Sequence, residues 1–169
     1  AALLEIGNSN TPNLATNYEN ALKDVQVLNA AAFHGELTVY AGLTDEVVAK
    51  YMDRMDIQDN PADDNIIFNY DLGTNDDHLF MNISKSNMAA AGTTNREDFE
   101  LDIAGNNGDD HIVTMIGDGV GVNADAWYIN STLNANLYIN GGNGDDTIET
   151  MGAGNFVIDA GNGNDAVYT

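Results

Sequence analysis

Aspartate follows a short run of glycine and asparagine at five places in this chain of 169 residues. The five nonapeptides are 72–80 (LGTNDDHLF), 105–113 (GNNGDDHIV), 120–128 (VGVNADAWY), 141–149 (GGNGDDTIE) and 160–168 (AGNGNDAVY). Glycine and asparagine tolerate positive φ, so a backbone rich in them bends tightly and can turn its carbonyl oxygens inward. The aspartate at the sixth position adds an anionic oxygen, and such oxygen-rich turns suit a hard cation, Ca²⁺ above all.

The repeat resembles the nonapeptide GGxGxDxUx of the RTX proteins, in which U is a large apolar residue. Block 141–149 matches it fully, and the other four blocks depart at one or two positions, such as Asn106 and Ala160. The resemblance is specific over 105–169, weaker over 59–104 and faint before that. It implies a parallel β-roll that holds Ca²⁺ at its turns, type I secretion and folding outside the cell.

Carboxylates and backbone carbonyls of these turns are the predicted Ca²⁺ ligands. They belong to Asp77, Asp109, Asp110, Asp125, Asp145, Asp146 and Asp165, and to Gly105, Gly108, Gly142, Gly144, Gly161 and Gly163. Stacked carboxylates repel one another without ions, so folding is predicted to depend on Ca²⁺. Copies that lack ligands indicate weak sites, in the range of about 10⁻⁴ to 10⁻³ M that is typical of extracellular modules.

The segments between the turns carry apolar residues at every second position, which predicts strands with one buried face. The inward residues are Ile66, Phe68, Tyr70, Leu79, Met81, Ile83, Phe99, Leu101, Ile103, Ile112, Thr114, Ile116, Trp127, Ile129, Leu137, Ile139, Ile148, Thr150, Phe156, Ile158 and Val167. The predicted fold class is all-β: a parallel β-roll or β-solenoid with Ca²⁺-binding Gly/Asp turns and one inserted short helix.

Successive turns of a two-sided roll fall on alternate edges, so each turn stacks on the turn after next. One predicted edge contains turns 72–77, 105–110, 131–135 and 151–155, and the other contains 59–64, 86–97, 117–125, 141–146 and 160–165. This places Asp77 over Asp110 on the first edge, and aligns Asp125, Asp146 and Asp165 on the second. Turns 131–135 and 151–155 lack the aspartate and are predicted to hold no ion.

Residues 1–58 form a predicted N-terminal part that precedes the Ca²⁺-binding roll of 59–169. Segments 24–29 and 35–41 have the pattern of short strands, which could be Ca²⁺-free solenoid coils. Residues 44–56 are predicted to be helical, because Thr44 suits an N-cap and the apolar residues that follow form one stripe.

Composition excludes several classes of function. The chain carries 27 acidic and 5 basic residues, a net charge of −22. Nucleic acids and anionic membranes require a basic surface, which five cations do not supply. No nucleophile elbow, HExxH motif or phosphate loop occurs, and the chain has no cysteine, so neither an enzyme nor a thiolate metal site is expected.

Two less specific interpretations stay open at this point. Asparagine and glycine are also favoured in the hairpin turns of an antiparallel sandwich. A halophilic surface would explain an acidic excess without ions, although it should use Glu as freely as Asp, whereas the chain has 20 Asp and 7 Glu.

The predicted function is that of a Ca²⁺-dependent structural or assembly module of a large secreted bacterial surface protein, similar to RTX surface-layer proteins or adhesins. Its predicted partners are Ca²⁺ and copies of itself or neighbouring solenoid segments, at an extracellular location. The alternative is the Ca²⁺-binding export or substrate-grip module of a type I secreted enzyme, such as a protease, lipase or alginate epimerase.

Overall fold

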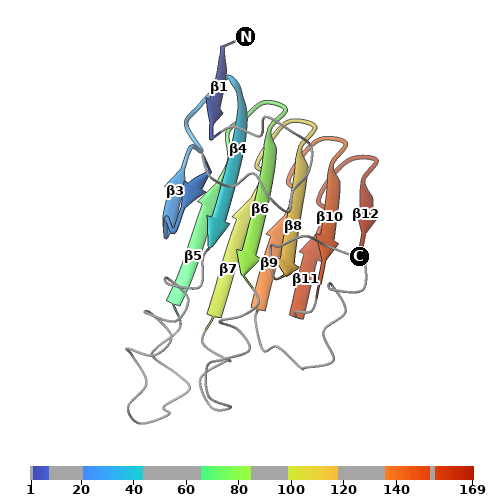
Figure 1. Ribbon diagram of the computed structural model, residues 1–169. Coiled ribbons are helices and arrows are strands. Elements are labelled where there is room, and N and C mark those ends of the chain that lie inside the picture. Colours follow the sequence, from blue (N-terminus) through green and yellow to red (C-terminus); the bar gives the residue numbers. More distant parts are fainter. Residues whose placement is uncertain (1, 8–20, 44–65, 85–98, 118–135, 153–154) are drawn as a thin grey trace.

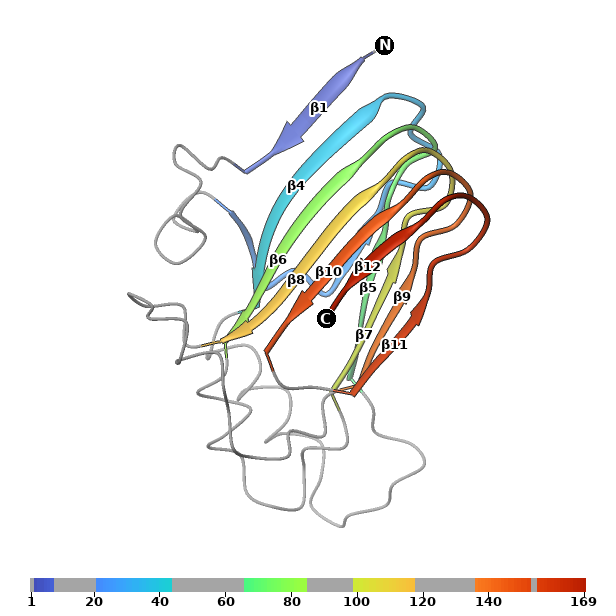
Figure 2. The same cartoon turned by 90° about the vertical axis from the view of Figure 1, so that its right-hand side faces the viewer.

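Two parallel β-sheets face each other across one apolar core (Figures 1 and 2). A computed structural model describes residues 2–7, 21–43, 66–84, 99–117, 136–152 and 155–169. Every strand pair in it is parallel. The all-β prediction is therefore confirmed for these residues. The alternative interpretation, in which the turns belong to hairpins of an antiparallel sandwich, is wrong for them. Among the same residues, no helix of membrane-spanning length and apolarity occurs.

Sheet A has the strand order β1-β4-β6-β8-β10-β12, and β2 pairs with the C-terminal half of β4. Its strands are β1 (Leu3–Ile6), β2 (Leu22–Lys23), β4 (Glu36–Leu43), β6 (His78–Ser84), β8 (His111–Gly117), β10 (Thr147–Met151) and β12 (Ala166–Tyr168). Sheet B has the order β11-β9-β7-β5-β3. Its strands are β3 (Val27–Asn29), β5 (Ile66–Asp71), β7 (Phe99–Ala104), β9 (Asn136–Asn140) and β11 (Asn155–Asp159).

Each strand of sheet B is followed by a tight turn and then by a strand of sheet A, and we call such a unit a layer. The five layers are β3–β4, β5–β6, β7–β8, β9–β10 and β11–β12. All five turns lie at one edge of the molecule, at the top of Figure 1. The last four of them, 72–77, 105–110, 141–146 and 160–165, carry the aspartates and are called the turn ladder here.

The inward rows confirm the predicted period-two strands. Leu79, Ile112 and Ile148 occupy one register row on sheet A and are fully buried. Leu101 and Leu137 form the equivalent row on sheet B. Val167 continues the first row next to Ile148, but its side chain is 44 % exposed because no described strand lies beyond β12.

The predicted sorting of the turns between two edges is wrong for the last two ladder turns. Turns 141–146 and 160–165 lie on the same edge as 72–77 and 105–110. The prediction placed turns 117–125 and 141–146 on one edge. It is also wrong for 151–155, which it placed with 72–77, since β10 ends and β11 begins on the edge opposite the ladder. Strand β8 ends and β9 begins on the edge opposite the ladder, so turn 141–146 after β9 lies on the ladder edge (Figure 2).

Several other predictions fall outside the described residues. They are the helix at 44–56, the turns 59–64, 86–97 and 131–135, the strand at 127–129, and Asp125. Strands β3 and β4 overlap the two segments predicted as strands in the first 58 residues. They pair in parallel with β5 and β6, so they share the two sheets with the later layers.

Candidate cation site in the turn ladder

The ladder turns keep a backbone shape that only their residue types allow. In turn 141–146, Gly142 and Gly144 have φ of 106° and 137°, and in turn 105–110 Asn106 and Gly108 have φ of 75° and 118°. Glycine adopts such angles freely, and asparagine does so more readily than other residues that carry a side chain. The small residues also bring neighbouring turns close, because a Cβ on Gly144 would overlap the carbonyl oxygen of Gly108.

The aspartates at the sixth turn position form an inner ladder that links successive layers. The Oδ1 of Asp110 accepts the backbone N–H of Asp77 at 2.8 Å, and the Oδ1 of Asp146 accepts that of Asp110 at 2.9 Å. The Oδ1 of Asp165 accepts the N–H of Asp146 at 3.0 Å. The prediction that Asp77 stacks with Asp110 and Asp146 with Asp165 is thus confirmed, but all four lie in one ladder.

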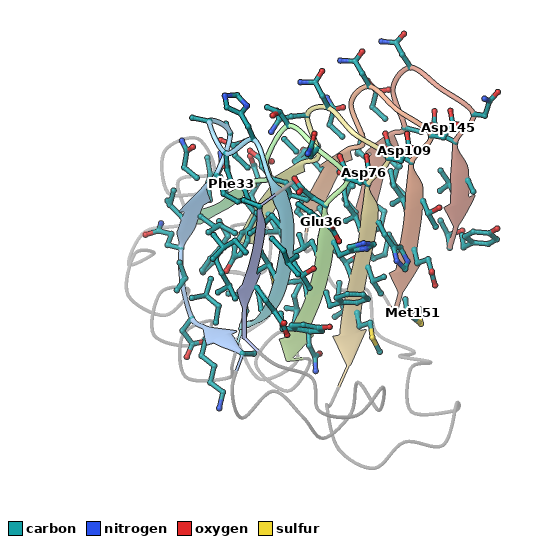
Figure 3. The ribbon with its side chains drawn as sticks, turned by 90° about the horizontal axis from the view of Figure 1, so that it is seen from above. Phe33, Glu36, Asp76, Asp109, Asp145 and Met151 are labelled. Carbon is teal, nitrogen blue, oxygen red and sulfur yellow. The ribbon has the colours of Figure 1, made fainter. Side chains whose placement is uncertain are left out.

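The residues at the fifth position form an outer ladder in which the hydrogen bonds run in the opposite direction. Asp109 donates its N–H to Asp76 at 2.9 Å, and Asp145 donates to Asp109 at 2.8 Å. Asn164 donates its backbone N–H to the Asp145 carboxylate at 2.8 Å and its side-chain Nδ2 to the same group. These two bonds from Asn164 lower the pKa of the exposed Asp145 carboxyl. Figure 3 shows Glu36 and these aspartates following one another along the turn edge.

A third ladder is made of side-chain amides at the third position. Asn143 donates its Nδ2 to the Oδ1 of Asn107 at 2.9 Å, and Asn162 donates to Asn143 at 2.9 Å. These amides, together with Asp76 and Asn164, were missed as members of the site. The signal was present in the sequence, because they fill the third and fifth columns of the aligned nonapeptides.

The second carboxylate oxygens of Asp110 and Asp146 are the unusual atoms of the site. Both residues are at most 2 % exposed, and both Oδ2 atoms are buried without a hydrogen-bond partner. The Oδ2 of Asp110 lies against the α-carbon of Gly105, where a Cβ would overlap both it and the carbonyl oxygen of Gly141. Gly141 is flanked in the same way by the Oδ2 of Asp146 and the carbonyl oxygen of Ala160. Two oxygens from adjacent layers therefore converge at each position.

Asp77, one layer towards the N-terminus, has no such unpartnered oxygen. Its Oδ1 accepts the N–H of Leu37 at 2.8 Å, and its Oδ2 accepts the N–H of Gly73 at 2.6 Å. Turn 30–35 of the preceding layer lacks the repeat. It places Phe33 next to Thr74, whose N–H donates a hydrogen bond to the Phe33 carbonyl oxygen at 3.0 Å. The ladder thus ends at Asp77 with both carboxylate oxygens satisfied by the backbone.

Burial and mutual repulsion make the inner carboxylates poor anions in the absence of a cation. Burial, together with the charges of Asp77 and Asp146, raises the pKa of Asp110 to about 8, although the hydrogen bond from the Asp77 N–H acts in the opposite direction. Burial likewise raises the pKa of Asp77 and of Asp146. A cation or a proton placed between these oxygens would relieve the repulsion.

The donor set fits Ca²⁺ in chemistry, because it consists of carboxylate and carbonyl oxygens. Within the described residues, no three His, Cys, Asp or Glu side chains converge as a metal cluster, so backbone carbonyls would have to supply part of the coordination. Asp77, Asp110, Asp146 and Asp165 are brought together in the inner ladder, and Asp109 and Asp145 in the outer one. Gly105, Gly108, Gly142, Gly144, Gly161 and Gly163 lie in the same turns. Asp125 is not among the described residues.

Fold and site together define the described part of the chain as a layered, parallel all-β structure whose single turn edge carries an aspartate ladder. No family model matches the chain, and none of the curated proteins or solved structures matches it either.

Proposed function

We propose that this chain is a Ca²⁺-stabilised structural module, a β-roll or β-solenoid segment of a large secreted bacterial surface protein such as a surface-layer protein or adhesin. The observation that carries the proposal is the pair of buried, unpartnered Oδ2 atoms of Asp110 and Asp146 within a stack of carboxylates. A buried polar atom without a partner costs about 1–3 kcal/mol, and more when it is charged. A bound cation removes that cost.

Within the described ranges, basic side chains contribute little to this edge. Among the described residues, the lysines and arginines are represented by Lys23 alone, on β2 at the N-terminal side of sheet A. The described residues of the three ladders are Asp, Asn and Gly, and we infer that the neutralising charge comes from solution. Ca²⁺ is favoured over Mg²⁺ because it accepts six to eight oxygens in irregular geometry.

The residues that would hold the ion are the carboxylates of Asp110 and Asp146 with the carbonyls of Gly141 and Ala160. The bound cation would supply charge neutralisation and a cross-link between layers β7–β8, β9–β10 and β11–β12. Asp77 would need no ion, because backbone N–H groups satisfy both of its oxygens. The ladder carboxylates serve as internal hydrogen-bond acceptors, so we infer a structural and not a catalytic role.

An extracellular location follows from the same reasoning. At Gly105 and at Gly141, one carboxylate Oδ2 and one backbone carbonyl oxygen from adjacent layers come together. Sites with few charged ligands bind Ca²⁺ in the range of about 10⁻⁴–10⁻³ M that is typical of extracellular modules. We propose that the chain folds when it meets Ca²⁺ outside the cell, as the resemblance to RTX repeats implies.

The test is a Ca²⁺ titration of the chelated full chain, followed by far-ultraviolet circular dichroism and thermal unfolding. Mg²⁺ at equal ionic strength is the control for screening. We expect Ca²⁺ to raise the β signal or the melting temperature at millimolar concentration, and Mg²⁺ to do much less. Unchanged spectra and melting temperatures in both series would contradict the proposal.

Variants locate the effect. Asp110→Asn and Asp146→Asn should each weaken the response to Ca²⁺, because each removes a buried carboxylate oxygen. Glu5→Gln on β1 removes the same charge from an exposed strand and is the matched control. If Glu5→Gln weakens the response as much as Asp110→Asn, the effect belongs to net charge and not to the ladder.

A further inference from the structure

The last described layer, β11–β12, presents an open end of both sheets, which faces the viewer in Figure 2. The side chains of Val167 and Tyr168 are 44 % and 61 % exposed there. Phe156 and Ile158 belong to the core rows of sheet B but are only partly buried. Edge strands of this kind are open to pairing with another strand.

The turn of this layer exposes the same hydrogen-bonding groups that join the preceding layers. In turn 141–146, the N–H groups of Gly144 and Asp146 are donated to the layer that follows. The equivalent N–H groups of Gly163 and Asp165 have no partner within the described residues, nor does the Oδ1 of Asn162. The end therefore displays a specific pattern of donors and acceptors beside an apolar strip.

Shape adds a second requirement to this pattern. A Cβ on Gly163 would overlap the carbonyl oxygen of Gly144, and one on Gly144 would overlap that of Gly108. The three turns that stack on another ladder turn thus each need glycine at the fourth position, namely Gly108, Gly144 and Gly163. A segment that stacks on turn 160–165 meets the same demand, since it would approach the Gly163 carbonyl in the same way.

The opposite end of the sheets does not offer this pattern. Leu37 stands in the register position of Asp77 and takes up the Asp77 carboxylate with its own N–H. Strands β1 and β2, which cover β4, carry the charged residues Glu5 and Lys23. The two ends are therefore unlike, and only the β11–β12 end continues the ladder.

We propose that the β11–β12 end is a docking surface for one more strand–turn–strand segment of the same repeat, added in parallel and in register. The occupant is defined by its chemistry: an alternating apolar strand on each side of a turn with glycine at the fourth position and aspartate at the sixth. The interface repeats the one that already joins β9–β10 to β11–β12. The proposal extends the assembly role above but uses no bound ion.

The test is binding of a labelled synthetic peptide with the sequence of residues 155–168, NFVIDAGNGNDAVY, to the full chain, measured by fluorescence anisotropy. The matched control peptide differs only by Gly163→Ala and keeps every apolar side chain. We expect saturable binding of the first peptide and at least tenfold weaker binding of the second. No binding at millimolar chain concentration, or equal binding of both peptides, would overturn the proposal.

Two variants of the full chain identify the end that binds. Val167→Lys puts a charge on the exposed strand β12 and should abolish binding, whereas Leu3→Lys on exposed β1 should leave it unchanged. Circular dichroism of both variants is the control for folding, and both should keep the wild-type spectrum. Loss of binding in Leu3→Lys alone, or in both variants equally, would place the peptide elsewhere. The peptide titration is repeated with the Asp110→Asn variant in Ca²⁺ and in chelator. This variant should change the response to Ca²⁺ but not the binding of the peptide, so the two proposals can fail separately.

Discussion

At the scale of single residues, Asp77 and Asp110 show how one residue type in one register position meets two environments. Both are buried members of the inner ladder. Asp77 has a backbone N–H on each carboxylate oxygen, whereas Asp110 has one on Oδ1 and none on Oδ2. The difference arises in the adjoining turns, since Gly73 donates to Asp77 within its own turn and no equivalent bond reaches Asp110.

Asp110→Asn should show opposite effects without and with Ca²⁺. Burial raises the pKa of Asp110 in the fold from 3.8 to about 8, so the folded metal-free state binds more protons than the unfolded state. The contribution of this group to stability is complete below about pH 4 and is lost as the pH rises to about 8. Asparagine imitates the protonated acid at every pH.

In chelator, the melting temperature of Asp110→Asn should therefore equal that of the wild type at low pH and exceed it above about pH 8. In excess Ca²⁺, the order should reverse, because the variant has lost an anionic ligand. A shift of 1 kcal/mol corresponds to about 2–4 °C in a chain of this size. A pH-independent difference in chelator would contradict the assignment.

Gly144→Ala should be among the most destabilising single substitutions in the ladder. Gly144 has φ of 137°, and a Cβ there would overlap the Gly108 carbonyl. Strain of this kind costs about 1–3 kcal/mol before the overlap is counted. Asn143→Ala in the same turn removes only an exposed amide and should cost at most about 1 kcal/mol. Denaturant unfolding of both variants tests this, and equal losses would show that the turn tolerates a side chain.

At the scale of elements, the layers are held by strand register and by the ladders at their turns. The row through Leu79, Ile112 and Ile148 is fully buried on sheet A. Outward positions on the same strands include His111 and Glu149, whose side chains meet at 2.9 Å on a partly exposed face. Exposed pairs of this kind contribute little, so the inward rows dominate the stability of each layer.

Ile112→Ala should destabilise the fold by about 2–5 kcal/mol, since it opens a cavity in a fully buried row. Val157→Ala on the outer face of β11 removes a side chain that is 56 % exposed and should cost less than about 1 kcal/mol. Chemical denaturation at fixed Ca²⁺ gives both values. A similar cost for the two variants would mean that the core does not lie between the sheets.

At the scale of the whole molecule, repulsion between negative charges destabilises the folded state, and burial of the apolar core stabilises it. A net charge of −22 over 169 residues generates repulsion that the compact state increases. The inner and outer ladders concentrate part of this charge along one edge (Figure 3). Ions in solution can therefore act on the molecule by general screening and, as proposed above, by binding at that edge.

These two actions can be separated in the chelated protein. Raising NaCl from about 0.1 M to about 1 M shortens the screening length from about 10 Å to about 3 Å and should raise the melting temperature gradually. Millimolar Ca²⁺ should raise it further than NaCl or MgCl₂ at the same ionic strength, because binding adds to screening. If ionic strength alone accounts for the Ca²⁺ series, the acidic surface acts only by screening.

The sequence by itself determined the local features of this protein. Alternation of apolar residues located the strands around Phe68, Leu101 and Ile148, because side-chain direction along a strand depends only on neighbouring residues. The Gly/Asn columns located the tight turns, because positive φ is a property of single residues. The stacking of Asp77 with Asp110 followed from these two patterns together with the two-sided roll that the resemblance to the nonapeptide repeat implies.

Only the tertiary structure decided which turns share an edge and which oxygens lack a partner. The edge of 141–146 depends on the edge at which β9 begins after β8 has ended, and no local sequence pattern fixes that edge. The opposite directions of the inner and outer ladders, and the unpartnered Oδ2 atoms of Asp110 and Asp146, depend on contacts between layers that are 19 to 36 residues apart in the chain. Such contacts are set by the packing of whole layers and not by the residue types of one turn.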